Sequence, residues 1–282
     1  MSYWRFAAMI LTSTLVMFAL MYLNTFATEH LYWSETRVYM AFLMGATMAV
    51  VMLSFMLSMY SSKTVNAAIF TGAVIVFAVS LWLVRSQQTV QDRSFLSAMI
   101  PHHSIAIMTS QRSELSDARV EKLAREIVLA QNREISEMRY LVADIAANGE
   151  TSEVYRDPPA TLGSLDEALN RTLISALDPA PMTPEDLPQA AGTEGLECGF
   201  RRVRSEDPIL RTGDDRALMK LNGIIVPLER QDAGAGRAWG APGVTMTVRK
   251  ADDADWRGGA ELIFALEQGL TVGYRGFYDC DI

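Results

Sequence analysis

Three long stretches without a charged residue dominate the N-terminal third of the sequence. They cover residues 6–28, 38–62 and 64–84 and contain 23, 25 and 21 residues. A helix needs about 20 apolar residues to cross the hydrocarbon core of a bilayer. Within lipid, a helix also satisfies its own backbone hydrogen bonds. The sequence therefore predicts a transmembrane region of three helices over residues 1–85.

A cleaved signal peptide is the alternative interpretation of the first stretch. Its apolar segment is long for a signal peptide, and Thr25-Phe26-Ala27 is a poor cleavage site. We therefore expect this stretch to remain in the protein as the first membrane span.

The few basic residues near the spans indicate their orientation. Arg5 precedes the first span, and Lys63 lies in the tight turn between the second and the third. The loop over residues 28–37 instead holds two glutamates and one arginine. Because Lys and Arg are enriched in cytoplasmic loops, we expect the N-terminus in the cytoplasm and everything after Arg85 outside it.

The region after the spans is acidic. From Arg85 onward there are 22 basic and 31 acidic residues, which is a net charge of −9. A surface of this sign repels the phosphates of nucleic acids and the headgroups of anionic lipids. We therefore expect no nucleic acid among the partners, and the lipid contact to be that of the spans with the bilayer.

Residues 92–147 have the pattern of a helical hairpin inside a domain over residues 86–149. Asp92 is a suitable N-cap, and SELSDAR at 113–119 separates the helices, with Ser116 or Asp117 capping the second. The first helix has an apolar stripe made of Phe95, Met99, Ile100, His103 and Ile107. The second has a heptad-like seam made of Val120, Ala124, Ile127, Gln131, Glu134, Met138, Leu141 and Ile145. Asn148-Gly149 ends it.

The rest of the chain has two parts that differ in composition. Residues 150–194 contain six prolines around one short helical pattern at 165–177, which indicates an extended linker. Residues 195–282 are typical of a small β-rich domain, with an alternating segment at 243–250 and a segment rich in aromatic and β-forming residues at 270–280. Within it, Asn222-Gly223 between two apolar runs predicts a two-residue β-hairpin turn.

The only two cysteines, Cys198 and Cys280, lie in the first and last predicted strands of this domain. Outside the cytoplasm such a pair is expected to form a disulfide. Closing so long a loop would contribute about 4 kcal/mol on the chain-entropy model. Two buried free thiols are the alternative.

The first helix of the hairpin carries two adjacent histidines after a proline, in the segment FLSAMIPHHSIAIM at residues 95–108. Pro101 removes one helical hydrogen bond and costs about 3 kcal/mol in a regular helix. We expect a kink that re-aims His102 and His103, with Met99 one turn before them. Gln131 and Glu134 interrupt the apolar seam of the second helix, and polar groups there are costly unless paired. These residues therefore predict a small polar site between the two helices.

This segment, together with LAREIVLAQNREISEM at residues 123–138, resembles the bacterial family named domain of unknown function 305. The resemblance covers residues 92–145, and the three spans are similar to a membrane-anchored branch of that family. It implies a ferritin-like helical domain whose better-understood relatives bind copper or silver in the periplasm. It also implies a protein of the bacterial inner membrane with its C-terminal domains in the periplasm.

By matching position, the resemblance implies a metal site made of Met99, His102, His103, Gln131, Glu134 and Met138. The family motif usually continues with a methionine where Thr109 stands here, and Met108 comes one residue earlier, about 100° around the helix. Thioether and imidazole ligands favour Cu(I). The alternative is a polar network that only orders the helix pair.

Two further features have simpler interpretations. Five methionines recur every four residues in the second span, at positions 40, 44, 48, 52 and 56. They could form a thioether ladder, but Ala41, Gly45 and Ala49 beside them are typical of close helix packing, next to which methionine is a flexible filler. His30, in the acidic loop between the first two spans, is expected to be solvated.

No pattern of an enzyme is present. A ferritin-like di-iron site needs glutamate three residues before a histidine, and Ala27, Met99 and Ile100 stand there. Hydrolase, zinc-finger and phosphate-loop patterns are also missing. Two functions remain: a membrane-tethered extracytoplasmic binder of copper or silver for metal handling or tolerance, and a non-metal assembly or sensing protein that binds a protein partner through its helical and β domains.

The hairpin also predicts a homodimer. Two helices cannot bury apolar surface on both sides, and a ferritin-like bundle needs four. Longer members of the resembled family contain two copies of the histidine motif, whereas this chain contains one. The alternative is a monomer in which the short helix at 165–177 folds back as a third helix.

Overall fold

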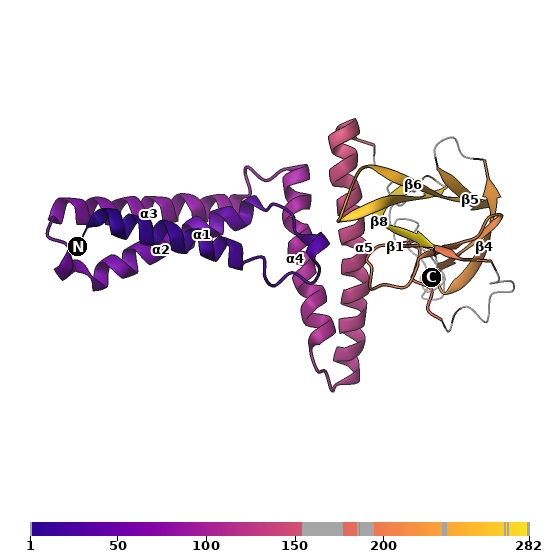
Figure 1. Cartoon of the computed structure of the whole chain (residues 1–282), viewed down its shortest axis with the longest axis horizontal. Helices are drawn as coiled ribbons and strands as arrows, with labels where there is room; N and C mark the ends of the chain where they lie inside the picture. Colours follow the sequence, from indigo (N-terminus) through magenta and orange to yellow (C-terminus); the bar gives the residue numbers. More distant parts are fainter. Residues whose placement is uncertain are drawn as a thin grey trace, which may run out of the picture. The chain divides into compact units, whose positions relative to one another are not determined.

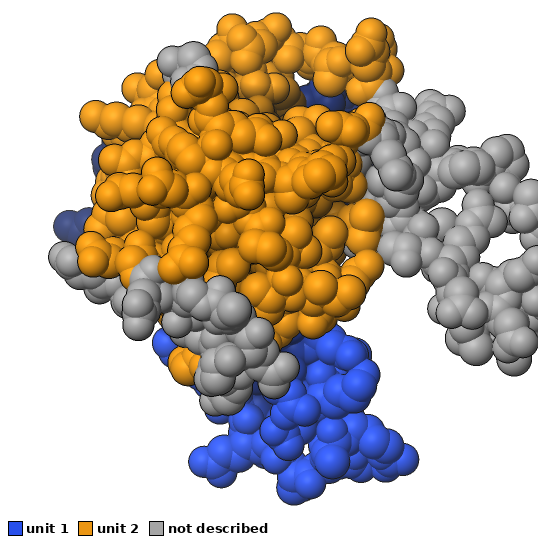
Figure 2. All heavy atoms as spheres, turned by 90° about the vertical axis from the view of Figure 1, so that its right-hand side faces the viewer, with its two compact units in different colours: residues 1–131 blue, residues 132–282 orange. Residues whose placement is uncertain are grey.

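The computed structural model describes residues 2–153, 177–184, 186, 195–232, 236–267, 269 and 271–280. Figure 1 shows its helices and strands. The chain forms two compact units, Met1–Gln131 and Asn132–Ile282 (Figure 2). The boundary lies within helix α5 (Ala118–Asn148) rather than in the proline-rich segment. The predicted helix at 165–177 lies outside the described residues except for Leu177. The fold class is mixed, with helices followed by a β domain.

Three of the helices are long and apolar enough to cross a membrane by length and composition. They are α1 (Tyr3–Leu20), α2 (Glu35–Phe55) and α3 (Lys63–Ser86). Two of them begin at serine caps, because the Ser34 hydroxyl accepts from the Arg37 amide and the Ser62 hydroxyl from the Val65 amide, each at 3.3 Å. Two short 3-10 turns follow α1 and α2. They are η1 (Thr28–His30), which begins at the last residue of the first uncharged stretch, and η2 (Leu57–Met59), which lies near the end of the second.

The small residues of α2 allow close helix packing, as the sequence predicts. Ala41, Gly45 and Ala49 are all buried. A Cβ atom added to Gly45 would collide with the hydroxyl of Thr14 on α1, so the two backbones approach closely at this point. The five methionines of the stripe at positions 40–56 are half-buried beside this contact.

One buried amide stands among the apolar helices, and it is satisfied. Asn66 of α3 accepts from the Tyr3 hydroxyl at 2.9 Å and donates to the Tyr60 carbonyl at 3.2 Å. The Tyr3 hydroxyl in turn accepts from the Ser62 amide at 3.1 Å. These bonds tie α1 to the start of α3 and remove the cost of a buried unpaired amide.

Both helices of the predicted hairpin are present. They are α4 (Asp92–Arg112) and α5 (Ala118–Asn148). Asp92 is the first residue of α4 rather than its N-cap, which is Gln91. Asp117 caps α5, because its carboxylate accepts from the Arg119 amide at 2.9 Å. Hydrogen bonds from the side chain and backbone of Arg119 lower the pKa of Asp117 to about 2.

The described residues of the second unit form eight antiparallel strands. They are β1 (Cys198–Arg201), β2 (Leu210–Thr212), β3 (Arg216–Leu221), β4 (Ile224–Gln231), β5 (Arg237–Ala241), β6 (Val244–Asp255), β7 (Gly258–Leu266) and β8 (Thr271–Cys280). Each pairs with the next, and β8 pairs with β1, so the sheet closes into a barrel. Alternate residues such as Val244, Met246 and Val248 fill the core, which has Trp239 at 0% exposure.

The predicted hairpin at Asn222-Gly223 is confirmed. Leu221 pairs with Ile224, so the two residues form the whole connection between β3 and β4. Both have positive φ angles, 49° at Asn222 and 77° at Gly223. Asparagine and glycine tolerate this left-handed conformation, which matches the twist of the flanking strands.

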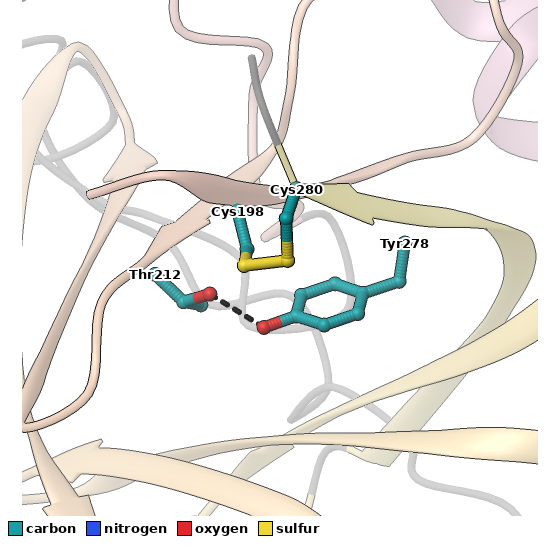
Figure 3. The surroundings of a disulfide bond; sticks show 4 residues. All are labelled: Cys198, Thr212, Tyr278 and Cys280. Carbon is teal, nitrogen blue, oxygen red and sulfur yellow. Dashed lines mark hydrogen bonds between the residues drawn. A yellow bond between two sulfur atoms is a disulfide. The ribbon is translucent and has the colours of Figure 1, made fainter. Parts of the chain in front are cut away.

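The two cysteines lie where the barrel closes. Cys198 of β1 is directly opposite Cys280 of β8, and the two form a disulfide (Figure 3). Beside them, the hydroxyls of Thr212 and Tyr278 are 2.7 Å apart. The bond therefore links the first and last strands across a sequence separation of 82 residues.

Within the second unit, the end of α5 packs against the barrel through residues that the predicted seam does not include. The buried Ser136 hydroxyl donates to the Arg275 carbonyl at 2.9 Å. A Cβ at Gly273 of β8 would collide with the ring of Tyr140. At the other end of the seam, Val120 is 47% exposed. Besides the predicted seam, α5 therefore buries a second set of residues, Asn132, Ser136 and Arg139, whereas Val120 at the start of the seam is exposed.

We expect Gly45→Val to destabilise the helical unit by about 1–3 kcal/mol, because the new side chain overpacks against Thr14. Gly72→Val is the matched control, since nothing lies within 4 Å of a Cβ there. Thermal unfolding of both variants in detergent measures the difference. Equal melting temperatures in the two variants would contradict the close approach of α1 and α2.

Candidate metal site and the contact that positions it

The histidine segment lies in the middle of α4, which continues through Pro101. Proline has no amide hydrogen, so the Ser97 carbonyl receives no bond from position 101. The buried residues of α4 are Ile100, Pro101, Ser104 and Ile107. The predicted stripe is therefore partly wrong, because Phe95 is 49% exposed and Ser104 takes the central buried position.

His103 is held by a backbone hydrogen bond. Its Nδ1 lies 3.0 Å from the carbonyl oxygen of Met99, one turn earlier on the same helix. A carbonyl only accepts, so this bond requires the proton on Nδ1 and leaves the lone pair on Nε2. Metal-binding histidines are commonly oriented in this way by a backbone carbonyl.

The two imidazoles differ in exposure. His102 is exposed and His103 is half-buried, and their ring centroids are 6.3 Å apart with an interplanar angle of 65°. Met99 is also half-buried. Thus one thioether and two imidazoles lie within a single turn of α4.

The six predicted site residues are divided between the two units. Met99, His102, His103 and Gln131 belong to the first. Glu134 and Met138 belong to the second, where Met138 is buried and Glu134 lies 3.7 Å from Arg133. In the part of the chain that the structure describes, no group of three or more His, Cys, Asp or Glu side chains is placed to hold a metal ion.

Sequence reasoning missed the contact next to the histidines. His30 is fully buried, not solvated as expected, and its Nδ1 lies 2.9 Å from the hydroxyl of Ser104. The same hydroxyl accepts from the Phe26 amide at 2.8 Å. The loop between α1 and α2 is thereby attached to α4 through one serine. Its signal in the sequence was a polar residue at helical spacing between Ile100 and Ile107.

The Ser104 contact decides which way the histidines point. Successive residues of a helix are about 100° apart. Because Ser104 faces the loop, His103 lies about a quarter turn away on the side of the helix, and His102 lies on the face opposite the loop. This placement agrees with the half-buried His103 and the exposed His102. The side of α4 that carries the imidazoles therefore differs from the side that binds the loop.

A second polar cluster lies in the β domain and is fully paired. Arg202 is buried, donates to both carboxylate oxygens of Glu206, and contacts Asp178 at 3.1 Å. Asp178 also accepts from the Tyr274 hydroxyl. Burial and the Asp178 charge raise the pKa of Tyr274. A protein tolerates buried charges only when they are paired with one another. We therefore assign a structural role to this cluster.

Comparison with known proteins gives two families described only as domains of unknown function. Residues 82–142 match DUF305, and residues 142–282 match DUF6692. An uncharacterized protein, L153, of Acanthamoeba polyphaga mimivirus is 33% identical over 106 residues, which are 37% of this chain and 68% of that protein. No solved structure matches. The resemblance of the histidine segment to DUF305 is thus confirmed.

We expect Ser104→Ala to destabilise the helical unit by about 1–3 kcal/mol, because it leaves the half-buried Phe26 amide without its acceptor. Thr109→Ala is the control, since its exposed hydroxyl donates only to the carbonyls of Ile105 and Ala106 within its own helix. Thermal unfolding and proteolysis of the loop over residues 21–34 measure the effect. An unchanged melting temperature and loop in Ser104→Ala would refute the role of this serine.

Proposed function

We propose that this chain, which belongs to the DUF6692 family through its C-terminal half and matches DUF305 over its central helices, is a membrane-tethered binder of a soft metal ion. The ion is copper or silver, and the protein serves metal handling or tolerance rather than catalysis. The observation that carries the proposal is the orientation of His103 beside Met99 on a helix that has a second imidazole in the same turn.

The chemistry of the ligands supports a soft ion. Thioether sulfur and imidazole nitrogen are preferred by Cu(I), whereas hard cations prefer oxygen. In this proposal Met99, His102 and His103 bind the ion, and Met138 is the next candidate. Gln131 and Glu134 orient an imidazole from outside, as amides and carboxylates commonly do around metal-binding histidines. The helical domain is ferritin-like in this account.

The rival function is a non-metal assembly or sensing protein that binds a protein partner through its helical and β domains. The Ser104 contact favours it, because it is a polar group of the same segment that holds the structure together without a metal. In this case His102 and His103 would belong to a polar network that only orders the helix pair. Measured Cu(I) affinity separates the two functions.

We expect the full-length protein in detergent to bind Cu(I) in competition with a chelator, and the double variant His102→Ala/His103→Ala to lose more than about 100-fold in affinity. Loss of an orienting neighbour alone typically costs about 10–100-fold, so loss of two ligands costs more. Glu134→Ala should therefore have a smaller effect than the double variant. The measurement is a chelator-competition titration.

The control for this titration is Met44→Leu/Met48→Leu, which removes two thioethers from α2 and leaves both imidazoles. It should bind Cu(I) as the original protein does. If the histidine variant keeps full affinity, the site assignment fails. If the α2 variant loses affinity instead, the metal site lies in the methionine stripe.

We also propose that the three apolar helices cross the bacterial inner membrane with the N-terminus inside and the C-terminal domains in the periplasm. Their length and composition support spanning, and Arg5 and Lys63 support the direction. A fusion of alkaline phosphatase to the C-terminus should therefore be active, because this enzyme folds only outside the cytoplasm. An inactive phosphatase with a fluorescent cytoplasmic reporter at the same point would reverse the orientation.

We further propose a homodimer built through the hairpin of α4 and α5, which would bring two histidine motifs together. A twofold pairing is the commonest oligomer symmetry. Light scattering of the full chain, corrected for bound detergent, should give twice the chain mass at micromolar concentration. A stable monomer under those conditions would exclude the dimer.

A further inference from the structure

The wall of the barrel opens at one end, between β7 and β8. The first paired residues of β7 and β8 at this end are Ala260 and Gly276. Beyond them β8 continues to pair with β1 as far as Cys280, without β7. The pairing of β6 with β7 is also interrupted here, between Lys250 and Asp255. A groove of about 600 Å³ occupies this opening.

Part of the groove lining is apolar, and the groove has free space. Its lining includes Val248, Ala260, Phe277 and Tyr278. A Cβ added to Gly259 in the same lining would meet nothing within 4 Å. Sites for small organic ligands typically have about 300–1,000 Å³ and combine apolar walls with a few polar groups. The groove falls within this range.

The remaining lining is rich in positive charge. It contains Arg204, Arg237, Arg249 and Lys250, against the two carboxylates of Asp255 and Asp279. This balance is opposite to that of the whole chain, which has a net charge of −8. Charge of one sign gathered in a cleft raises the local concentration of ligands of the other sign.

Internal ion pairs neutralise only part of this lining. Arg249 is paired with Glu261 at 2.9 Å, and Asp255 with Arg257 at 2.8 Å. Among the described residues, no carboxylate lies within ion-pair distance of the exposed Arg237 or Lys250. These two cations therefore remain available to a ligand.

The third cation is held in a defined place. The guanidinium carbon of Arg204 lies 4.0 Å from the ring centroid of Phe277. This contact is a cation–π interaction and orients the planar group at the groove. A guanidinium presents a fixed fork of donors that matches the oxygens of a phosphate.

We propose that this groove of the β domain binds a phosphate monoester that carries an apolar body. The phosphate, with a charge of about −1.5 to −2 at pH 7, lies among Arg204, Arg237 and Lys250, and the apolar part lies against Val248, Ala260 and the Tyr278 ring. A ligand with this chemistry can come from the headgroup of a phosphorylated lipid or from a soluble organic phosphate.

The test uses the full chain in nanodiscs of phosphatidylcholine and the fluorescent phosphate monoester 4-methylumbelliferyl phosphate. We expect saturable binding in an anisotropy titration, with a dissociation constant in the micromolar range. Arg237→Gln/Lys250→Gln should weaken binding at least tenfold. The phosphate-free 4-methylumbelliferone should bind at least tenfold more weakly than the phosphate.

The matched control is Arg216→Gln/Arg230→Gln, which removes two exposed cations of the barrel outside the groove and should keep full affinity. Absence of saturable binding up to millimolar probe, or equal loss in both double variants, overturns the proposal. A second arm replaces part of the phosphatidylcholine by phosphatidic acid, whose headgroup is a phosphate monoester. Displacement of the probe identifies a lipid as the source of the phosphate, and no displacement identifies a soluble ligand.

Discussion

The buried hydroxyl of Ser104 is the polar contact on which the arrangement of the first unit depends. It accepts from the Phe26 amide and contacts the buried ring of His30, so it satisfies polar groups of the loop between α1 and α2. Without it, the half-buried Phe26 amide would lack its acceptor, at a cost of about 1–3 kcal/mol. The contact attaches the loop after the first apolar helix to α4. It also turns His102 and His103 to the other sides of that helix, where a ligand from outside can reach them.

The major elements could be predicted because they depend on local patterns. Uncharged stretches longer than a bilayer core indicate the three apolar helices, and Asn222-Gly223 indicates a tight hairpin because both residues tolerate positive φ. The closed barrel could not be predicted in the same way, since the pairing of β1 with β8 joins residues at both ends of the domain. The cysteines at those ends were the one long-range signal of this closure.

In the candidate site too, local contacts could be predicted from the sequence and long-range contacts could not. The adjacent histidines, the proline and Met99 are visible as a motif, and the hydrogen bond from His103 to the Met99 carbonyl follows from their spacing of four residues. Burial of His30 was not predictable, because its partner lies 74 residues away. The second face of α5 was missed for a related reason. Serine, asparagine and arginine do not mark a buried face until a partner such as the Arg275 carbonyl is known.

The central claim is that the imidazoles and thioether of α4 hold a soft metal ion, and X-ray absorption at the copper edge tests it most directly. The full-length protein, loaded with one equivalent of Cu(I) under reducing conditions, should show a first coordination shell that contains both nitrogen and sulfur. The multiple-scattering features of imidazole should also be present. A shell of oxygen alone, or a spectrum that is unchanged when His102 and His103 are both replaced by alanine, would contradict the account.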